Sequence, residues 1–188
     1  MAIEIEKKYR LDKRSRKELT ARLAELGATF STERFEENFL YRHGAEDVTS
    51  RLRLRVIGDT TYLTYKERVK SDSEFKTKIE HETIVSDAEE MRQIIAKLGY
   101  DLAVIYEKYR KTWHLGKCEI VLDELPFGIY MEIEGEPENI LKVEKKLGAN
   151  VLESEPRGYA RLTIKLCKET NGIYEARFGK VAAARSER

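Results

Sequence analysis

This sequence has little cysteine and no long apolar run, and each shortage excludes a class of protein. Its two cysteines, Cys118 and Cys167, are too few for a disulfide framework and lack the spacing of metal ligands. No signal peptide is recognisable, and no apolar stretch approaches the roughly 20 residues of a membrane span. We therefore expect a soluble cytoplasmic protein that has no membrane partner.

An excess of charge of one sign is also missing. Lys and Arg number 35 against 34 Asp and Glu, which gives a net charge of +1 and does not predict a global basic field that would hold duplex nucleic acid. Charged residues nevertheless make up 37% of the 188 residues, above the roughly 25% of average proteins. Any anion-binding site must be local. Because the sequence has no glycine-rich loop of the Walker type, side chains would have to hold a bound phosphate.

Helical segments are marked by a recurring end. Three stretches with apolar residues at helical spacing finish at Leu-Gly, and glycine tolerates the left-handed conformation that stops a helix. We predict that these helices begin near Asp12, at a capping box formed by Ser86 and Glu89, and near Pro137. The helix ends are Leu26-Gly27, Leu98-Gly99 and Leu147-Gly148, and a stripe of Tyr159, Leu162 and Leu166 predicts a fourth, short helix.

Between the helices the apolar period changes from about 3.6 to 2, which is typical of strands. Consecutive strands on short turns indicate an antiparallel sheet, and about eight such strands can close into a barrel without edges. We therefore predict an α+β fold, an eight-stranded antiparallel β-barrel with helices packed outside, over residues 1–168, and a polar, mobile tail at 169–188. The predicted strands are 2–10, 34–42, 51–57, 61–68, 75–85, 103–115, 117–124 and 129–135.

Charged and apolar residues alternate along most of these strands, so that each strand has one charged face. In the first strand Glu4, Glu6 and Lys8 share a face, with Ile3 and Ile5 on the other. A single charged row is usual for a strand that is half exposed to water. The amphipathic helices, however, need apolar strand faces to cover, which would turn the charged faces inward and give the barrel a polar interior. Unpaired charge is costly there unless a ligand or metal compensates it.

The composition of the charged faces indicates the class of ligand. Carboxylates at alternate positions, Glu4 with Glu6 and Glu132 with Glu134, offer the hard oxygen ligands that suit Mg²⁺ or Mn²⁺. Arginines and lysines on other strands offer the cations that bind phosphate oxygens. A divalent metal together with several cations is what a polyphosphate requires, so we predict a triphosphate-binding site inside the barrel.

The opening residues Glu4-Ile5-Glu6-Lys7-Lys8 match the ExExK signature of the CYTH superfamily, also called the triphosphate tunnel metalloenzymes. The chain resembles this family from residue 3 to about 166. The resemblance implies an eight-stranded tunnel that binds a triphosphate with metal, as in inorganic and thiamine triphosphatases, class IV adenylate cyclases and RNA triphosphatases. Further motifs follow in the family's order: Leu52-Arg-Leu-Arg55, Leu63-Thr-Tyr-Lys66, Lys78-Ile-Glu80-His-Glu82, Lys108-Tyr-Arg110, Leu122-Asp123 and Glu132-Ile-Glu134.

The resemblance also implies roles for individual residues. Asp123 and either Glu80 or Glu82 would be further acids that hold metal or orient water, so that the catalytic set is Glu4, Glu6, Lys8, Asp123, Glu80 and Glu82. The implied metal ligands are Glu4, Glu6, Asp123, Glu132 and Glu134. The implied substrate-binding cations are Lys8, Arg53, Arg55, Lys66, Lys78, Lys108 and Arg110, with Lys165 on the terminal helix as a candidate of uncertain register.

Three functions fit this set of residues. The first is a metal-dependent hydrolase of tripolyphosphate, ATP or thiamine triphosphate, in which cations neutralise the phosphate oxygens and a carboxylate orients water. The second is a class IV adenylate cyclase that makes cyclic AMP and pyrophosphate from ATP. The third is a non-catalytic polyphosphate or nucleotide sensor. We favour hydrolysis, and a homodimer is a further candidate partner. The histidines are far apart in sequence and are expected to have structural or surface roles.

Overall fold

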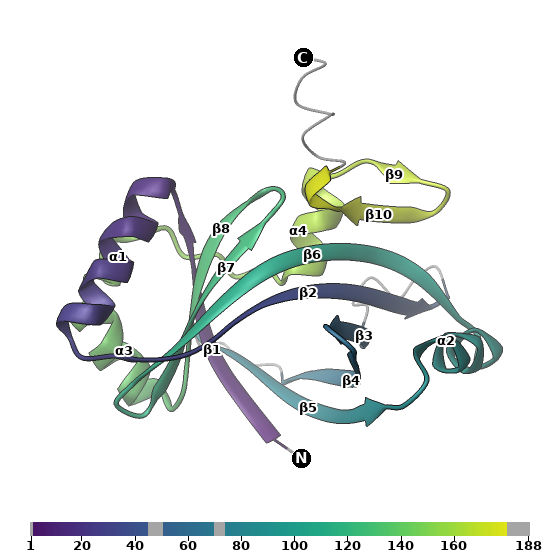
Figure 1. Cartoon of the computed structure of the whole chain (residues 1–188), viewed down its shortest axis with the longest axis horizontal. Helices are drawn as coiled ribbons and strands as arrows, with labels where there is room; N and C mark the ends of the chain where they lie inside the picture. Colours follow the sequence, from purple (N-terminus) through teal and green to yellow (C-terminus); the bar gives the residue numbers. More distant parts are fainter. Residues whose placement is uncertain (1, 45–50, 70–73, 180–188) are drawn as a thin grey trace.

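The structure is a computed structural model that describes residues 2–44, 51–69 and 74–179 (Figure 1). The first eight strands and the four α-helices follow one another in the order that the hydrophobic periods predict. The strands are β1 (Ala2–Leu11), β2 (Thr29–His43), β3 (Leu52–Ile57), β4 (Thr60–Val69), β5 (Lys76–Val85), β6 (Tyr100–Leu115), β7 (Cys118–Leu125), β8 (Gly128–Glu134), β9 (Glu169–Thr170) and β10 (Ile173–Ala176). The helices are α1 (Lys13–Glu25), α2 (Ala88–Lys97), α3 (Pro137–Leu147), α4 (Tyr159–Leu166) and the short 3₁₀ turn η1 (Ala149–Val151).

Eight of the strands close into an antiparallel barrel. They are hydrogen-bonded in the order β2-β3-β4-β5-β1-β8-β7-β6, and a long pairing between β6 and β2 closes the ring. These two strands are the longest of the barrel, at 15 and 16 residues, and they curve together over its upper side in Figure 1. The predicted eight-stranded α+β barrel is therefore confirmed.

Two hydrophobic clusters lie outside the barrel wall, beneath helices α1, α2 and α3. Helices α1 and α3 lie together on one side and α2 lies on the opposite side (Figure 1). Leu23 of α1 and Ile140 of α3 are fully buried in one cluster with Met131 of β8, whereas Ile95 of α2 packs with Leu54 of β3. Apolar faces point outward under helices, so the charged faces point inward, and the predicted polar interior is confirmed.

Helix starts follow the predicted signals with one correction. The Asp12 side chain caps α1 by accepting a hydrogen bond from Ser15 N, and Pro137 opens α3. The cap of α2 is Asp87 rather than Ser86, because the Asp87 carboxylate accepts from the backbone N–H groups of Glu89 and Glu90. A carboxylate at this position also interacts favourably with the helix dipole, which a serine hydroxyl does much less.

Helix α4 covers one end of the barrel and is held on both flanks. Before it, Ser154 forms a bridge with Tyr9 of β1, beyond the point where β5 leaves that strand. After it, β10 runs parallel to β6 and pairs with Val104–Tyr106, beyond the end of β7. Residues 169–170 and 173–176 of the predicted tail form strands that the sequence did not indicate, since the free edge of β6 offers hydrogen-bond partners to β10 and Ala176 is buried. Residues 180–188 lie outside the described part.

No helix in the described residues is both long enough and apolar enough to cross a membrane.

Candidate active site

The interior of the barrel is lined by the charged rows, because residues that face each other across neighbouring strands share a face. Glu6 of β1 lies opposite Glu134 of β8, and Lys8 lies opposite Glu132. Asp123 of β7 lies opposite Arg110 of β6 in the same way. Many of these ionisable side chains are almost fully buried. The buried inward-facing ones are Glu6, Lys8, Glu36, Arg53, Lys108, Arg110, Asp123 and Glu132.

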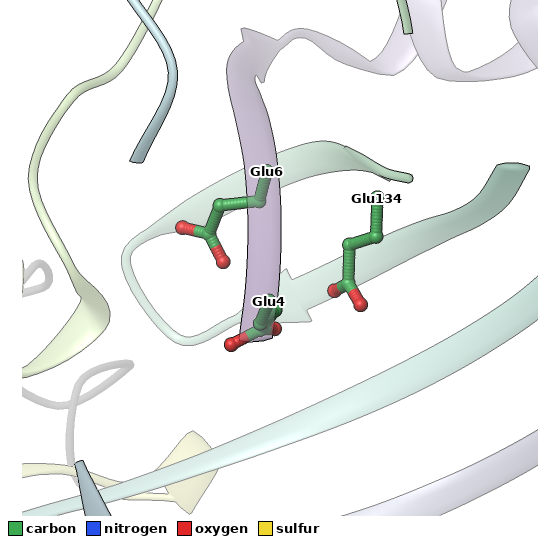
Figure 2. Close-up of side chains that lie close together, drawn as sticks. All are labelled: Glu4, Glu6 and Glu134. Carbon is green, nitrogen blue, oxygen red and sulfur yellow. The ribbon is translucent and has the colours of Figure 1, made fainter. Parts of the chain in front are cut away.

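Three carboxylates converge at one place in the lumen, and we call them the acidic cluster. Glu4 and Glu6 come from β1 and Glu134 from the adjacent β8, and Figure 2 shows the three side chains close together. One oxygen from each lies within 4.8 Å of the others. Lys78 of β5 donates to Glu6 at 2.7 Å and to Glu4 at 3.3 Å, which balances part of this negative charge.

The clustering of the three carboxylates disfavours the ionised form of Glu134. Burial, together with the negative charges of Glu4 and Glu132, raises the pKa of Glu134 to about 8. A cation bound among the three carboxylates would remove the penalty. Their hard oxygen atoms match the ligand preference of Mg²⁺ and Mn²⁺, so the residues present fit a divalent metal.

The other two implied metal ligands belong to a second group, the central ion-pair cluster of Lys8, Lys108, Arg110, Asp123 and Glu132. Arg110 donates two bonds to Asp123, at 2.7 and 2.5 Å, and one to Glu132 at 2.7 Å. Lys8 Nζ lies 2.9 Å from Glu132 and Lys108 Nζ lies 3.3 Å from Asp123. Burial alone would raise the pKa of Glu132, but Lys8 and Arg110 hold it well below its usual range.

The β3–β4–β5 wall contributes a third set of contacts. Glu82 accepts two bonds from Arg55, at 2.9 and 3.0 Å, and its Oε2 lies 3.6 Å from Arg53. Lys66 forms an ion pair with Glu80 across β4 and β5. Burial and the nearby charge of Arg53 lower the pKa of Lys66 to about 8. Both implied acids of β5, Glu80 and Glu82, are therefore engaged with cations.

One implied substrate ligand lies apart from these contacts, and several lumen residues were not predicted. Lys165 is an exposed side chain of α4. Glu36 and Asn38 of β2 are both fully buried and face inward, and the alternation along β2 could have revealed them. Lys76 donates to Glu6 at 3.2 Å and belongs to a charged row that is visible in the sequence. The sequence marks Tyr159 only as one residue of an apolar stripe, so its place in the lumen was not predicted.

The Tyr159 side chain extends from α4 into the lumen and contacts the central ion-pair cluster. Its hydroxyl donates a hydrogen bond to Asp123 at 2.8 Å. The ammonium groups of Lys8 and Lys108 lie 3.7 and 5.3 Å from the centre of its ring, within the range of cation–π attraction. The helix at the end of the barrel therefore contacts the side chains that would bind phosphate.

The protein-family comparison matches the CYTH domain over residues 2–159. The chain belongs to the CYTH family. A Methanocaldococcus jannaschii protein that is provisionally named an adenylate cyclase is 29% identical over 150 residues, which cover 77% of this chain and 83% of that protein. Membership of this family therefore explains both the fold and the order of the motifs along the chain.

Solved structures of other proteins have a similar fold. The PH1012 protein of Pyrococcus horikoshii is 26% identical, with a TM-score of 0.71 over 85% of this chain and 98% of that one. A Hippeastrum protein described as an adenylyl cyclase with a dominant triphosphatase activity is 18% identical, with a TM-score of 0.61 over 84% of this chain and 91% of that one. At that identity the likeness shows the fold alone.

Proposed function

We propose that this protein is a divalent-metal-dependent triphosphatase that hydrolyses tripolyphosphate or an organic triphosphate inside the barrel. The observation that carries the proposal is the convergence of the acidic cluster and of cations from at least five strands on one enclosed lumen. Carboxylates alone would suit a metal-binding protein, and cations alone would suit an anion carrier. Both together match the charge of a metal–triphosphate complex.

Each wall of the lumen would have its own part in the reaction. Glu4, Glu6 and Glu134 would hold Mg²⁺ or Mn²⁺, which supplies charge neutralisation at the phosphate oxygens when it is bound. Arg53, Arg55 and Lys66 would bind phosphate oxygens, exchanging their present carboxylate partners for substrate. Arg110 and Lys108 would bind others while Asp123 keeps the guanidinium oriented. A carboxylate of the lumen, Glu80 or Glu82, would accept a proton from the attacking water.

Two alternatives use the same lining. A class IV adenylate cyclase would use a ribose hydroxyl of ATP as the nucleophile, and the provisional name of the M. jannaschii relative is the observation in its favour. A polyphosphate or nucleotide sensor would bind without turnover. We favour hydrolysis because water needs no additional pocket, whereas cyclisation requires the base and ribose to be held in one orientation.

A substrate panel tests the proposal. Purified protein is incubated with tripolyphosphate, ATP or thiamine triphosphate, with Mg²⁺, with Mn²⁺ or with EDTA, and products are separated by ion-exchange chromatography. We expect orthophosphate that depends on metal. Cyclic AMP with pyrophosphate would establish the cyclase instead. Micromolar binding of these anions in calorimetry, without any product, would establish the sensor.

A further inference from the structure

Asn38 is a buried amide whose polar atoms lack partners. It lies on the inward face of β2 between Glu36 and Leu40, and its side chain is fully buried. Neither Nδ2 nor Oδ1 has a hydrogen-bond partner among the residues that the structure describes. Burying an amide without partners is destabilising, so a chain retains one where something else supplies the hydrogen bonds. A leucine of similar volume would avoid the cost.

Other unpaired atoms lie around Asn38 on the same wall. Arg55 of β3 is directly opposite Asn38, and Arg53 is opposite Leu40. The Nε atoms of both arginines are buried without a hydrogen-bond partner in the described residues, although their terminal nitrogens contact Thr64 or Glu82. Glu36 Oε2 lies 3.4 Å from Lys108 Nζ and has no hydrogen-bond partner within the described part of the chain. Unmet donors and unmet acceptors therefore occur together on β2 and β3.

The types of these unpaired atoms restrict which ligand could form hydrogen bonds with β2 and β3. Guanidinium Nε and amide Nδ2 donate, and the oxygens of a triphosphate can accept from them. Asn38 Oδ1 needs a donor, which a fully ionised tripolyphosphate does not have. A hydroxyl or amino group both donates and accepts, and it would pair with both ends of the amide.

The surroundings of Asn38 also suit an organic group. Tyr106 of β6 is opposite Asn38, and Leu40 packs with Tyr106, Tyr130 and Leu162 in the apolar cluster under α4. Asn38 thus lies where the charged lining gives way to the apolar end of the lumen. A triphosphate whose phosphates lie among the cations would place its organic part at this boundary.

We propose that Asn38 binds a hydroxyl or amino group in the non-phosphate part of an organic triphosphate, and so selects such a substrate over tripolyphosphate. The inference rests on the proposed function, because it assumes that a triphosphate enters this lumen. It goes further by assigning a specificity residue that lies outside the charged motifs. The hydroxyl of a ribose and the amino group of an aminopyrimidine share the required chemistry.

The test compares Asn38→Leu with wild type on ATP, thiamine triphosphate and tripolyphosphate. Leucine keeps the volume and removes both polar atoms, so the melting temperature should stay the same or rise, whereas a structural asparagine would make it fall. We expect kcat/KM for the preferred organic substrate to fall about tenfold or more, and kcat/KM for tripolyphosphate to change less than about threefold. Asn38→Thr, whose hydroxyl donates and accepts, should recover part of the loss.

Thr163→Val is the matched control, because Thr163 is equally buried but its hydroxyl already donates to the Tyr159 carbonyl at 2.9 Å. It should affect the three substrates by the same factor. An equal loss on all substrates in Asn38→Leu, no loss at all, or a wild-type enzyme that cleaves tripolyphosphate alone would overturn the inference and leave the proposed function intact. If wild type cleaves nothing, the proposed function fails, and calorimetric affinities of the same ligands for both proteins decide the inference.

Discussion

Glu132 and Glu134 are two residues apart on β8 and face the same lumen, yet their surroundings are opposite. Glu132 contacts Lys8 and Arg110 in the central ion-pair cluster, and these cations hold its pKa well below the usual range. Glu134 lies beside Glu4 and Glu6 in the acidic cluster, and its pKa is raised to about 8. One strand therefore supplies a carboxylate that the protein neutralises itself and another that, under the proposed function, a bound metal ion would neutralise.

This difference separates a structural use of charge from a ligand-binding use. Buried ion pairs that are fully satisfied hold side chains in one arrangement, and breaking one partner leaves the other charge buried and unpaired. Like charges held close together repel one another, and a metal ion bound between them would relieve that repulsion. The comparison predicts that substitutions in the central cluster harm the fold as well as phosphate binding, whereas substitutions in the acidic cluster harm mainly metal binding and turnover.

The largest effect is expected from Arg110→Leu, which breaks the central cluster. The change leaves Asp123 and Glu132 without the cation between them, and removal of one buried partner costs about 3–5 kcal/mol. Urea denaturation should show that loss of unfolding free energy. Lys111→Met is the control, since Lys111 is the next residue on β6 and pairs with Glu33 on the exposed outer face. Equal stability of the two variants would contradict a structural role for the cluster.

The next effect concerns turnover. Glu6→Gln removes one charge from the acidic cluster and leaves the cationic walls in place, so substrate binding should largely survive. We expect kcat to fall by about 100-fold or more, since metal acts mainly as charge moves in the transition state. Steady-state kinetics at saturating Mg²⁺ and Mn²⁺ measure the fall. Glu33→Gln on the outer face serves as the control, and unchanged turnover in Glu6→Gln would contradict a metal-binding role for Glu6.

Arg53, a cation outside both clusters, is expected to contribute to substrate binding in the ground state. Arg53 of β3 is buried and contacts Thr64 at 3.2 Å and Glu82 at 3.6 Å. Arg53→Ala should raise KM about tenfold with a smaller change in kcat, because phosphate cations act before the transition state as well as in it. Calorimetric titration of tripolyphosphate should give the same loss of affinity. A fall in kcat alone would place Arg53 with the acidic cluster in function.

The smallest effect is a pH dependence that isolates Glu134. Its folded pKa of about 8 lies above the ordinary value of 4.5, so the folded state keeps a proton that the unfolded state has released. The resulting stability is complete below pH 4.5 and is lost as the pH rises to about 8. Glu134→Gln cannot ionise, so in EDTA its melting temperature should gain on wild type between pH 5 and 8.

A gain of a few degrees would correspond to about 1 kcal/mol at this chain length. Differential scanning fluorimetry in a series of buffers measures it. Adding Mg²⁺ or Mn²⁺ should reverse the order of the two proteins at pH 8, because only wild type retains the third carboxylate. A melting-temperature difference that is constant with pH would show that Glu134 is ionised without metal.

Most of the fold could be predicted from the sequence, because period-2 alternation and helix ends are local signals. The inward direction of the charged strand faces could also be predicted, since amphipathic helices need an apolar surface to cover. What the sequence could not give was pairing across the lumen. Nothing local distinguishes Glu132 from Glu134, whose separation into two clusters depends on Arg110 and Lys8 arriving from other strands.

Two further details depended on tertiary structure. Tyr159 looks like an ordinary apolar position of a short helix, and its contact with Asp123 arises only when α4 covers the end of the barrel. The strand β10 was missed because its partner is the free edge of β6 beyond β7, which no local pattern marks. Asn38, by contrast, lay on a predicted strand, and its face could have been assigned by alternation.

The position of β1 in the barrel has a consequence for how the protein is made. Both of its neighbours in the barrel, β5 and β8, follow it in the sequence and are synthesised much later. Glu4 and Glu6 therefore remain solvated, without Glu134, until most of the chain has emerged. Pairings between such distant segments form late in folding and slow it. A nascent chain that ends before β8 has no acidic cluster, so a metal ion bound there would stabilise only the almost complete barrel.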